Sequence, residues 1–153
     1  MKFWRSTASR LAPREIFDFL SVTGGVPRYL EELDPGLSAA ENIRRLCFTP
    51  SGTLFKDFNE IFAAVFGKEA TLKRNILVQL ATGPQTGEEL SKRLKCDNNG
   101  HFTEQLNALS LAGFISAERG INPATGKRAR VGRYRIRDNY TRFYLKYIEP
   151  VKN

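Results

Sequence analysis

Apolar residues in the second half of the chain recur at spacings of three and four, the period of an α-helix with one buried face. This pattern predicts helices over residues 72–80, Gly87–Leu94 and 101–112. Thr86 and Glu89 form a capping box at the start of the second of these helices, because a hydroxyl and a carboxylate three residues apart satisfy backbone N–H groups at a helix start. These signals define three short helices in succession.

Two segments after the third helix have strand composition, residues 114–117 and 134–136. The loop between them is rich in Gly, Pro and Arg. Three short helices followed by a β-hairpin are typical of the winged helix-turn-helix. We expect the third helix to bury four residues: Phe102, Leu106, Leu109 and Leu111.

The first half of the chain predicts helices alone. They cover residues 14–20, a short segment from Pro27, a segment that Ser38 opens, and residues 54–66, and a last helix follows the wing over residues 140–148. We expect Phe17 in the first helix and Tyr147 in the last to face inward, since both lie on apolar stripes.

The predicted fold is therefore mainly α: a helical lid-like segment followed by a winged helix-turn-helix with a small β-hairpin wing. The boundary is expected where charge balance and helix spacing change, near residue 70. This gives a helical segment over residues 1–69 and a winged-helix domain with a closing helix over residues 70–153.

Charge is distributed unevenly along the 153 residues. The formal net charge is +8, and residues 71–153 carry all of it, because residues 1–70 hold nine Lys/Arg and nine Asp/Glu. Residues 119–137 contain seven Lys/Arg and no acid. Such focused charge favours a polyanionic partner. The alternative is a solvated hairpin that keeps the protein in solution.

The winged helix predicts contacts to nucleic acid from the third helix and the wing. The candidate residues are Asn99, His101, Gln105, Lys127, Arg128, Arg130, Arg133 and Arg135. The third helix holds no Lys or Arg, and Glu104 would repel phosphate. This composition argues against strong base-specific recognition, since guanine readout favours Arg. Docking of a protein partner on the winged helix remains an alternative.

Composition gives little support for other kinds of site. One histidine and two separated cysteines do not supply the ligands of a structural zinc site, so we expect no metal. No stretch reaches the roughly 20 apolar residues that span a bilayer, and no secretory segment opens the chain. We therefore expect a cytoplasmic protein with no membrane partner and with unpaired thiols.

Residues 23–30, TGGVPRYL, contain a more specific pattern. This string resembles the Gly-Gly-(Ile/Val)-Pro-x-Tyr-Leu signature of the archaeal and bacterial STAND-type ATPases of the AAA+ P-loop class. The order of later segments is similar to the same family, with LFKDF at residues 54–58 and YRIRDNYTRFY at residues 134–144. RLAPREI at residues 10–16 resembles the linker out of the ATPase core.

The resemblance implies that the Gly-x-Pro element forms a lid over a nucleotide. Gly25 and Pro27 would contact the adenine, and Arg28 would sense the phosphates. The chain contains neither a Walker A nor a Walker B motif, so we expect it to be inactive alone and to bind ATP with Mg²⁺ only together with an upstream ATPase core. On this interpretation the chain is a fragment of a longer protein.

Three functional hypotheses follow. The first is the carboxy-terminal portion of a STAND/AAA+ ATPase, whose winged helix acts as a DNA- or protein-binding output module. The second is a free-standing winged-helix DNA-binding transcription regulator. The third is a protein-interaction module in a toxin–antitoxin or defence setting.

Overall fold

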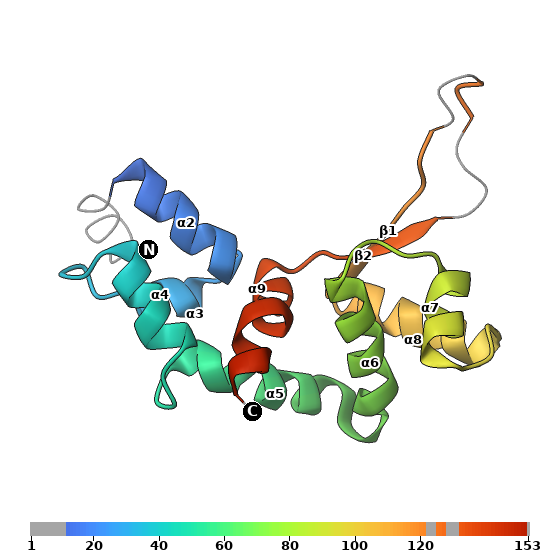
Figure 1. Ribbon diagram of the computed structural model, residues 1–153, viewed down its shortest axis with the longest axis horizontal. Coiled ribbons are helices and arrows are strands. Elements are labelled where there is room, and N and C mark those ends of the chain that lie inside the picture. The colour runs from blue at the N-terminus through green and yellow to red at the C-terminus, as the bar shows by residue number, and fades with distance from the viewer. Residues whose placement is uncertain (1–11, 122–124, 128–131, 153) are drawn as a thin grey trace. The chain divides into compact units, whose positions relative to one another are not determined.

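The computed structural model describes residues 12–121, 125–127 and 132–152 (Figure 1). It is mainly helical, with one small antiparallel hairpin of two strands. The chain forms two compact units. The first unit comprises Met1–Val65 together with Asn139–Asn153, and the second unit comprises Phe66–Asp138.

The first unit contains α-helices and a closing segment with a widened turn. Its elements are α2 (Pro13–Thr23), α3 (Pro27–Glu31), α4 (Ala39–Cys47), α5 (Thr53–Phe66, ending at the unit boundary), α9 (Asn139–Phe143), the π-helical turn η2 (Tyr144–Ile148) and the 3₁₀ turn η3 (Glu149–Val151).

Local sequence explains where these helices begin and end. Pro13 occupies the first turn of α2, and Gly24 ends that helix with φ +67°, a conformation that favours glycine. Ser38 and Glu41 form the expected capping box at the start of α4. Gly52 precedes α5 at a point where a Cβ would collide with the backbone carbonyls at the end of α4, so this position requires glycine.

The core of the first unit is aromatic. Phe58 stacks on Tyr144 with ring centroids 4.3 Å apart and on Phe62 at 5.6 Å. Tyr29 packs against Tyr140 at 5.2 Å. Such ring pairs stabilise a core beyond the apolar area that they bury.

The closing helix, α9 with η2 (residues 139–148), belongs to the first unit. The predicted domain division had assigned it to the winged-helix domain. The helix packs with the first unit, because the buried Tyr140 hydroxyl donates to the Leu54 carbonyl at 2.7 Å and the rings of Tyr140 and Tyr144 enter the aromatic core. A segment that follows the wing in sequence therefore completes a unit begun by residues before the wing.

The second unit is a winged helix-turn-helix. Its elements are η1 (Gly67–Glu69), α6 (Ala70–Ala81), α7 (Gly87–Leu94), α8 (Gly100–Leu111), β1 (Ile115–Glu118) and β2 (Arg133–Ile136). The strands pair antiparallel with Ile115 opposite Ile136. Gln85, in the segment between α6 and α7, forms a further antiparallel bridge with Tyr134 of β2. A third extended segment therefore supports the wing.

The core of the second unit is mostly aliphatic. Three expectations about burial are wrong, one in this unit and two in the first unit. Leu106 and Leu109 of α8 are buried as predicted, whereas Leu111, the last residue of the helix, is 90% exposed. Phe17 of α2 and Tyr147 of the closing segment are also exposed. By helical periodicity each of these three residues lies at the edge of an apolar stripe, where a neighbouring element need not cover the side chain.

Two further observations concern the described residues. No helix among them is long and apolar enough to cross a membrane. Cys47 is fully buried, and burial raises the pKa of its thiol to about 12, while Cys96 is partly accessible. Both thiols are free.

Candidate functional site

Two capping interactions position the helix-turn-helix of the second unit. Thr86 Oγ1 accepts from the Glu89 N–H at 3.1 Å, and Glu89 Oε2 accepts from the Thr86 N–H at 2.7 Å. Asn99 caps α8, because its Oδ1 accepts from the Phe102 N–H at 3.0 Å. Asn99 was predicted to contact nucleic acid, and in the structure it is exposed while its oxygen serves as the cap.

A buried polar contact joins α6 to α8. Lys73 is 2% exposed, and its Nζ donates to Gln105 Oε1 and to Glu69 Oε2, the latter at 2.9 Å. The same ammonium lies 5.2 Å from the centroid of the Phe66 ring. This contact holds the two helices in one register, because a buried ammonium must keep its acceptors.

The structure corrects the prediction for Gln105. Its side chain is 4% exposed and is engaged by Lys73, so it faces the interior and not a ligand. Sequence reasoning missed this pair, although a signal was present: Lys73 lies on the same helical face as Ile76, Leu77 and Leu80. A lysine on an apolar stripe indicates a buried acceptor nearby.

The outer face of α8 is polar and carries no cation. Its exposed residues are His101, Thr103, Glu104, Asn107 and Leu111. His101 Nδ1 lies 3.9 Å from Glu104 Oε2. His101 thus remains accessible, as predicted, but its neighbour is a carboxylate that would oppose a phosphate.

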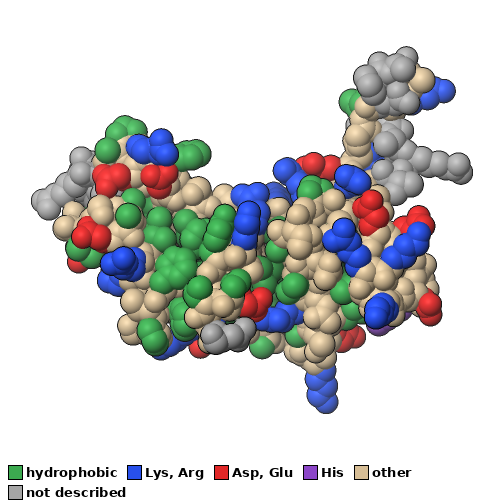
Figure 2. All heavy atoms as spheres, viewed as in Figure 1, with side chains coloured by type: hydrophobic (Ala, Val, Ile, Leu, Met, Phe, Trp, Pro, Cys, Tyr) green, Lys and Arg blue, Asp and Glu red, His purple; other side chains and the backbone are tan. Residues whose placement is uncertain are grey.

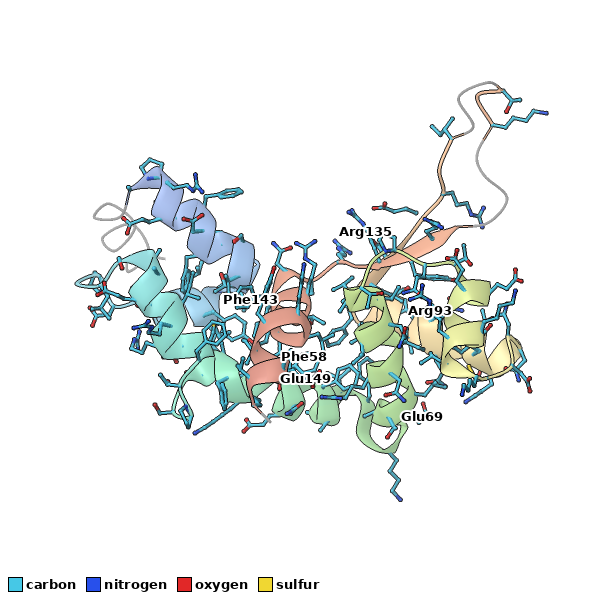
Figure 3. All side chains as sticks on the ribbon, viewed as in Figure 1. Phe58, Glu69, Arg93, Arg135, Phe143 and Glu149 are labelled. Atoms are coloured by element: carbon cyan, nitrogen blue, oxygen red, sulfur yellow. The ribbon has the colours of Figure 1, made fainter. Side chains whose placement is uncertain are left out.

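The wing, residues 119–137, carries seven of the thirteen Lys/Arg of the second unit. Alternation along β2 turns Tyr134 and Ile136 toward the protein and leaves Arg133 and Arg135 exposed. Figure 3 labels Arg135 beside this strand. Arg133 Nη2 lies 3.2 Å from Glu89 Oε1, and Arg135 Nη2 lies 2.6 Å from Glu118 Oε1. Arg133 and Arg135, both predicted to contact phosphate, therefore form ion pairs with carboxylates of the same unit.

Other wing cations have no ion pair within the described part of the chain. Arg119, Lys127 and Arg137 are exposed, and no salt bridge is recorded for them. Arg128 and Arg130, which were predicted to bind nucleic acid, lie outside the described residues. Residues 66–138 hold thirteen Lys/Arg and seven Asp/Glu, so the second unit carries most of the positive charge.

The capping acid of α7 is also electrostatically coupled to the wing. The Thr86 N–H lowers the pKa of Glu89, and Arg133 lowers it further. Both interactions favour the ionised carboxylate, so Glu89 stabilises the start of α7 and tethers β2 at neutral pH.

The first unit contains the residues predicted to contact a nucleotide. Gly24 and Gly25 both have positive φ, +67° and +79°. Pro27 begins α3 and is exposed, so its ring is available to a neighbour. The structure therefore leaves the Gly-Gly-Val-Pro corner at the surface.

Arg28 is only partly available. Its side chain is 64% exposed, and Nη2 lies 3.4 Å from Asp57 Oδ2, whose side chain is 7% exposed. Burial raises the pKa of Asp57, and Arg28 partly opposes that rise. A phosphate at Arg28 would therefore compete with a buried carboxyl.

No cluster of three or more His, Cys, Asp or Glu suited to a metal ion occurs within residues 12–121, 125–127 and 132–152. No group of side chains described above forms a nucleophile and base. The second unit combines a polar outer face of α8 with a cationic hairpin.

Comparison with known proteins adds one structural likeness. No family model and no curated protein matches the chain. Among solved structures, the chain is similar to reduced HlyU from Vibrio cholerae N16961, with 18% sequence identity and a TM-score of 0.46. The similarity covers 62% of this chain and 93% of that one.

Proposed function

We propose that the second unit binds duplex DNA through its basic wing, as part of a winged-helix DNA-binding regulator. The observation that carries this proposal is the run of seven Lys/Arg without an acid over residues 119–137, attached to a folded helix-turn-helix. Cations concentrated on one hairpin match the regular negative charge of a duplex.

The wing supplies affinity and α8 supplies little sequence discrimination. Arg119, Lys127 and Arg137 are exposed and have no recorded carboxylate partner among the described residues, so they are the first candidates for phosphate contacts. Arg133 and Arg135 can exchange their carboxylates for phosphates at small cost, because exposed ion pairs contribute little stability. Thr103 and Asn107 on α8 offer only neutral hydrogen bonds to base edges.

The test is the salt dependence of binding to a random-sequence duplex. Replacing Arg119, Lys127 and Arg137 together by Gln should reduce the slope of log K against log salt by about 0.9 for each lost contact, or about 2.7 in all. The matched control replaces Arg14, Arg44 and Lys56 of the first unit by Gln, with the same change in net charge. An equal slope in the two triple variants would show that these three wing cations do not contribute to duplex binding.

A second function rests on a different observation, the exposure of Pro27 beside two glycines with positive φ. We infer that this corner could act as the lid of an ATPase core of the STAND class, in the manner that the sequence resemblance implies. Gly25 and Pro27 would then approach the adenine, and Arg28 would leave Asp57 to meet a phosphate. ATP with Mg²⁺ would be bound only with that core.

ATP hydrolysis separates the second function from the first. The chain alone should show none, and hydrolysis should arise when a P-loop core encoded upstream is supplied. In that complex Pro27→Ser should weaken ATP binding, whereas Pro50→Ser, at an exposed loop proline of the same unit, should not. Hydrolysis by the chain alone, or an equal effect of both proline variants, would contradict the lid.

A further inference from the structure

A basic, aromatic pocket lies within the first unit, between α2 and the closing helix. Its volume is about 230 Å³, and it is lined by Ser21, Asn139, Arg142, Phe143, Lys146 and Tyr147. None of these residues belongs to the wing or to the Gly-Gly-Val-Pro corner. The pocket therefore shares no residue with either surface considered above.

The sequence of the closing helix explains why these side chains converge. Arg142 and Lys146 are four residues apart, as are Phe143 and Tyr147, so each pair shares a helical face. The π-helical turn over Tyr144–Ile148 widens the backbone at this point, and such turns are frequent at functional sites. Figure 3 marks Phe143 on α9.

The electrostatics of the pocket favour an anion. Its lining contains two cations and no carboxylate. Arg142 Nη2 donates to the neutral Asn139 Oδ1 at 3.0 Å, and Lys146 Nζ lies 5.4 Å from the centroid of the Tyr147 ring. One turn before Ser21 on α2, Asp18 is held by Arg14 at 3.2 Å. No ion pair of Arg142 or Lys146 is recorded within the described residues.

An aromatic ladder runs beside these cations. Phe48 and Phe143 have ring centroids 6.1 Å apart, and Phe143 and Tyr147 follow at 5.1 Å. Both ends of the ladder are accessible, with Phe48 39% and Tyr147 48% exposed. Figure 2 shows hydrophobic side chains gathered on the visible face of the first unit, with Lys and Arg among them.

We propose that this pocket binds a nucleotide unit, with the base stacked on Tyr147 and the phosphate held by Arg142 and Lys146. Accessible rings beside cations are the combination that proteins use for unpaired nucleotides, since every base has a face that stacks and every nucleotide has a phosphate. Asn139 and Ser21 supply neutral hydrogen bonds to the base edge or the sugar. The pocket is smaller than a typical site for a drug-sized ligand, so it would enclose only part of a nucleotide and leave the rest exposed to solvent.

Two sources share this chemistry, a free mononucleotide and one nucleotide of a single strand. The experiment titrates the whole chain with AMP in one arm and with an eight-residue oligothymidylate in the other, following binding by calorimetry and by backbone NMR shifts. Saturable binding that shifts the amides of residues 139–147 supports the proposal in either arm, and the arm that binds more tightly identifies the source. Absence of binding in both arms at millimolar ligand would overturn it.

Variants distinguish the two halves of the ligand. Tyr147→Ala should weaken binding about tenfold through loss of stacking, and Arg142→Gln with Lys146→Gln should weaken it at least tenfold through loss of phosphate contacts. The matched controls are Phe17→Ala, an exposed ring on α2, and Arg44→Gln with Lys56→Gln, the same charge change elsewhere in the unit.

Three outcomes would overturn the assignment. They are an equal effect of the control and pocket variants, no effect of Tyr147→Ala, and displacement of AMP by inorganic phosphate at equal concentration, because the last would indicate an anion site without base recognition. All the substituted side chains are exposed, so the fold should persist, and circular dichroism of each variant checks this.

Discussion

The two units reach stability with different side chains. The first unit buries Phe19, Tyr29, Phe58, Phe62, Tyr140 and Tyr144, whereas the second unit buries aliphatic residues around one fully buried ring, Phe102. Buried tyrosines bring hydroxyls that need acceptors, and Tyr140 meets this need at the Leu54 carbonyl. Within the described residues, the aliphatic core includes no buried tyrosine, and its buried polar side chains are Lys73, Gln85, Ser91 and Gln105.

The comparison extends to the surfaces. In the second unit seven of the thirteen Lys/Arg lie on a hairpin whose described residues offer few rings, which suits a duplex whose bases are already stacked. In the first unit two cations lie next to accessible rings, which suits a nucleotide with a free face. Under the two proposals, the same kind of charge would bind different ligands, depending on whether aromatic side chains lie beside it.

The largest expected effect tests the aromatic core. Phe58→Ala should destabilise the first unit by about 3–5 kcal/mol, because it removes a buried ring that stacks on Phe62 and Tyr144. Hydrogen exchange of the α5 and closing-helix amides measures the loss. The control Phe17→Ala removes an exposed ring and should cost less than about 0.5 kcal/mol. Similar losses in both variants would show that the ring cluster does not dominate this core.

A smaller effect is expected at the polar edge of the aliphatic core. Lys73→Met leaves Gln105 Oε1 buried without its donor and should cost the second unit about 1–3 kcal/mol. Adding Gln105→Leu removes the unpaired acceptor and should recover most of that loss, which a double-mutant cycle measures in urea. Lys68→Met, at an exposed position, is the control. If the losses in the free energy of unfolding were additive in the double variant, Lys73 and Gln105 would not couple α6 to α8.

The smallest expected effect concerns pH. The pKa of Glu89 is lowered in the folded protein, so its stabilising contribution is present at neutral pH and is lost as the pH falls through this lowered pKa, below the ordinary range of a glutamate. Asp57 in the first unit behaves oppositely, since burial raises its pKa and its protonation relieves a buried charge.

The α7 amides report this difference. In the wild type, the hydrogen-exchange protection of these amides should fall as the pH is lowered. Glu89→Gln should make this fall smaller. Asp57→Asn should leave it unchanged and alter only the first unit. A Glu89→Gln variant with the wild-type acid profile would show that the capping acid does not link α7 to the wing.

The period of the apolar residues predicted most of the fold. The helix predicted over residues 72–80 is α6, Ala70–Ala81, and α7 has the predicted bounds. The Thr86 and Glu89 capping box and the antiparallel wing are confirmed. These features depend on local signals, which sequence carries directly.

Tertiary partners could not be predicted in the same way. The sequence placed Gln105 on the outer face of α8, because nothing local shows that Lys73 reaches it across 32 residues. The closing helix was assigned to the winged-helix domain for the same reason, since its contact with Leu54 spans 86 residues. The pocket at Arg142 and Tyr147 was missed because its stripe was interpreted as core alone.

The difference between the two thiols has a practical consequence. Cys47 is fully buried and its raised pKa keeps it protonated, so maleimide reagents should modify Cys96 first. Cys96 directly follows the left-handed Lys95 that ends α7, within the second unit. A fluorophore or spin label attached there would report on the helix-turn-helix without any engineered cysteine, so the native chain already provides a spectroscopic handle on that unit.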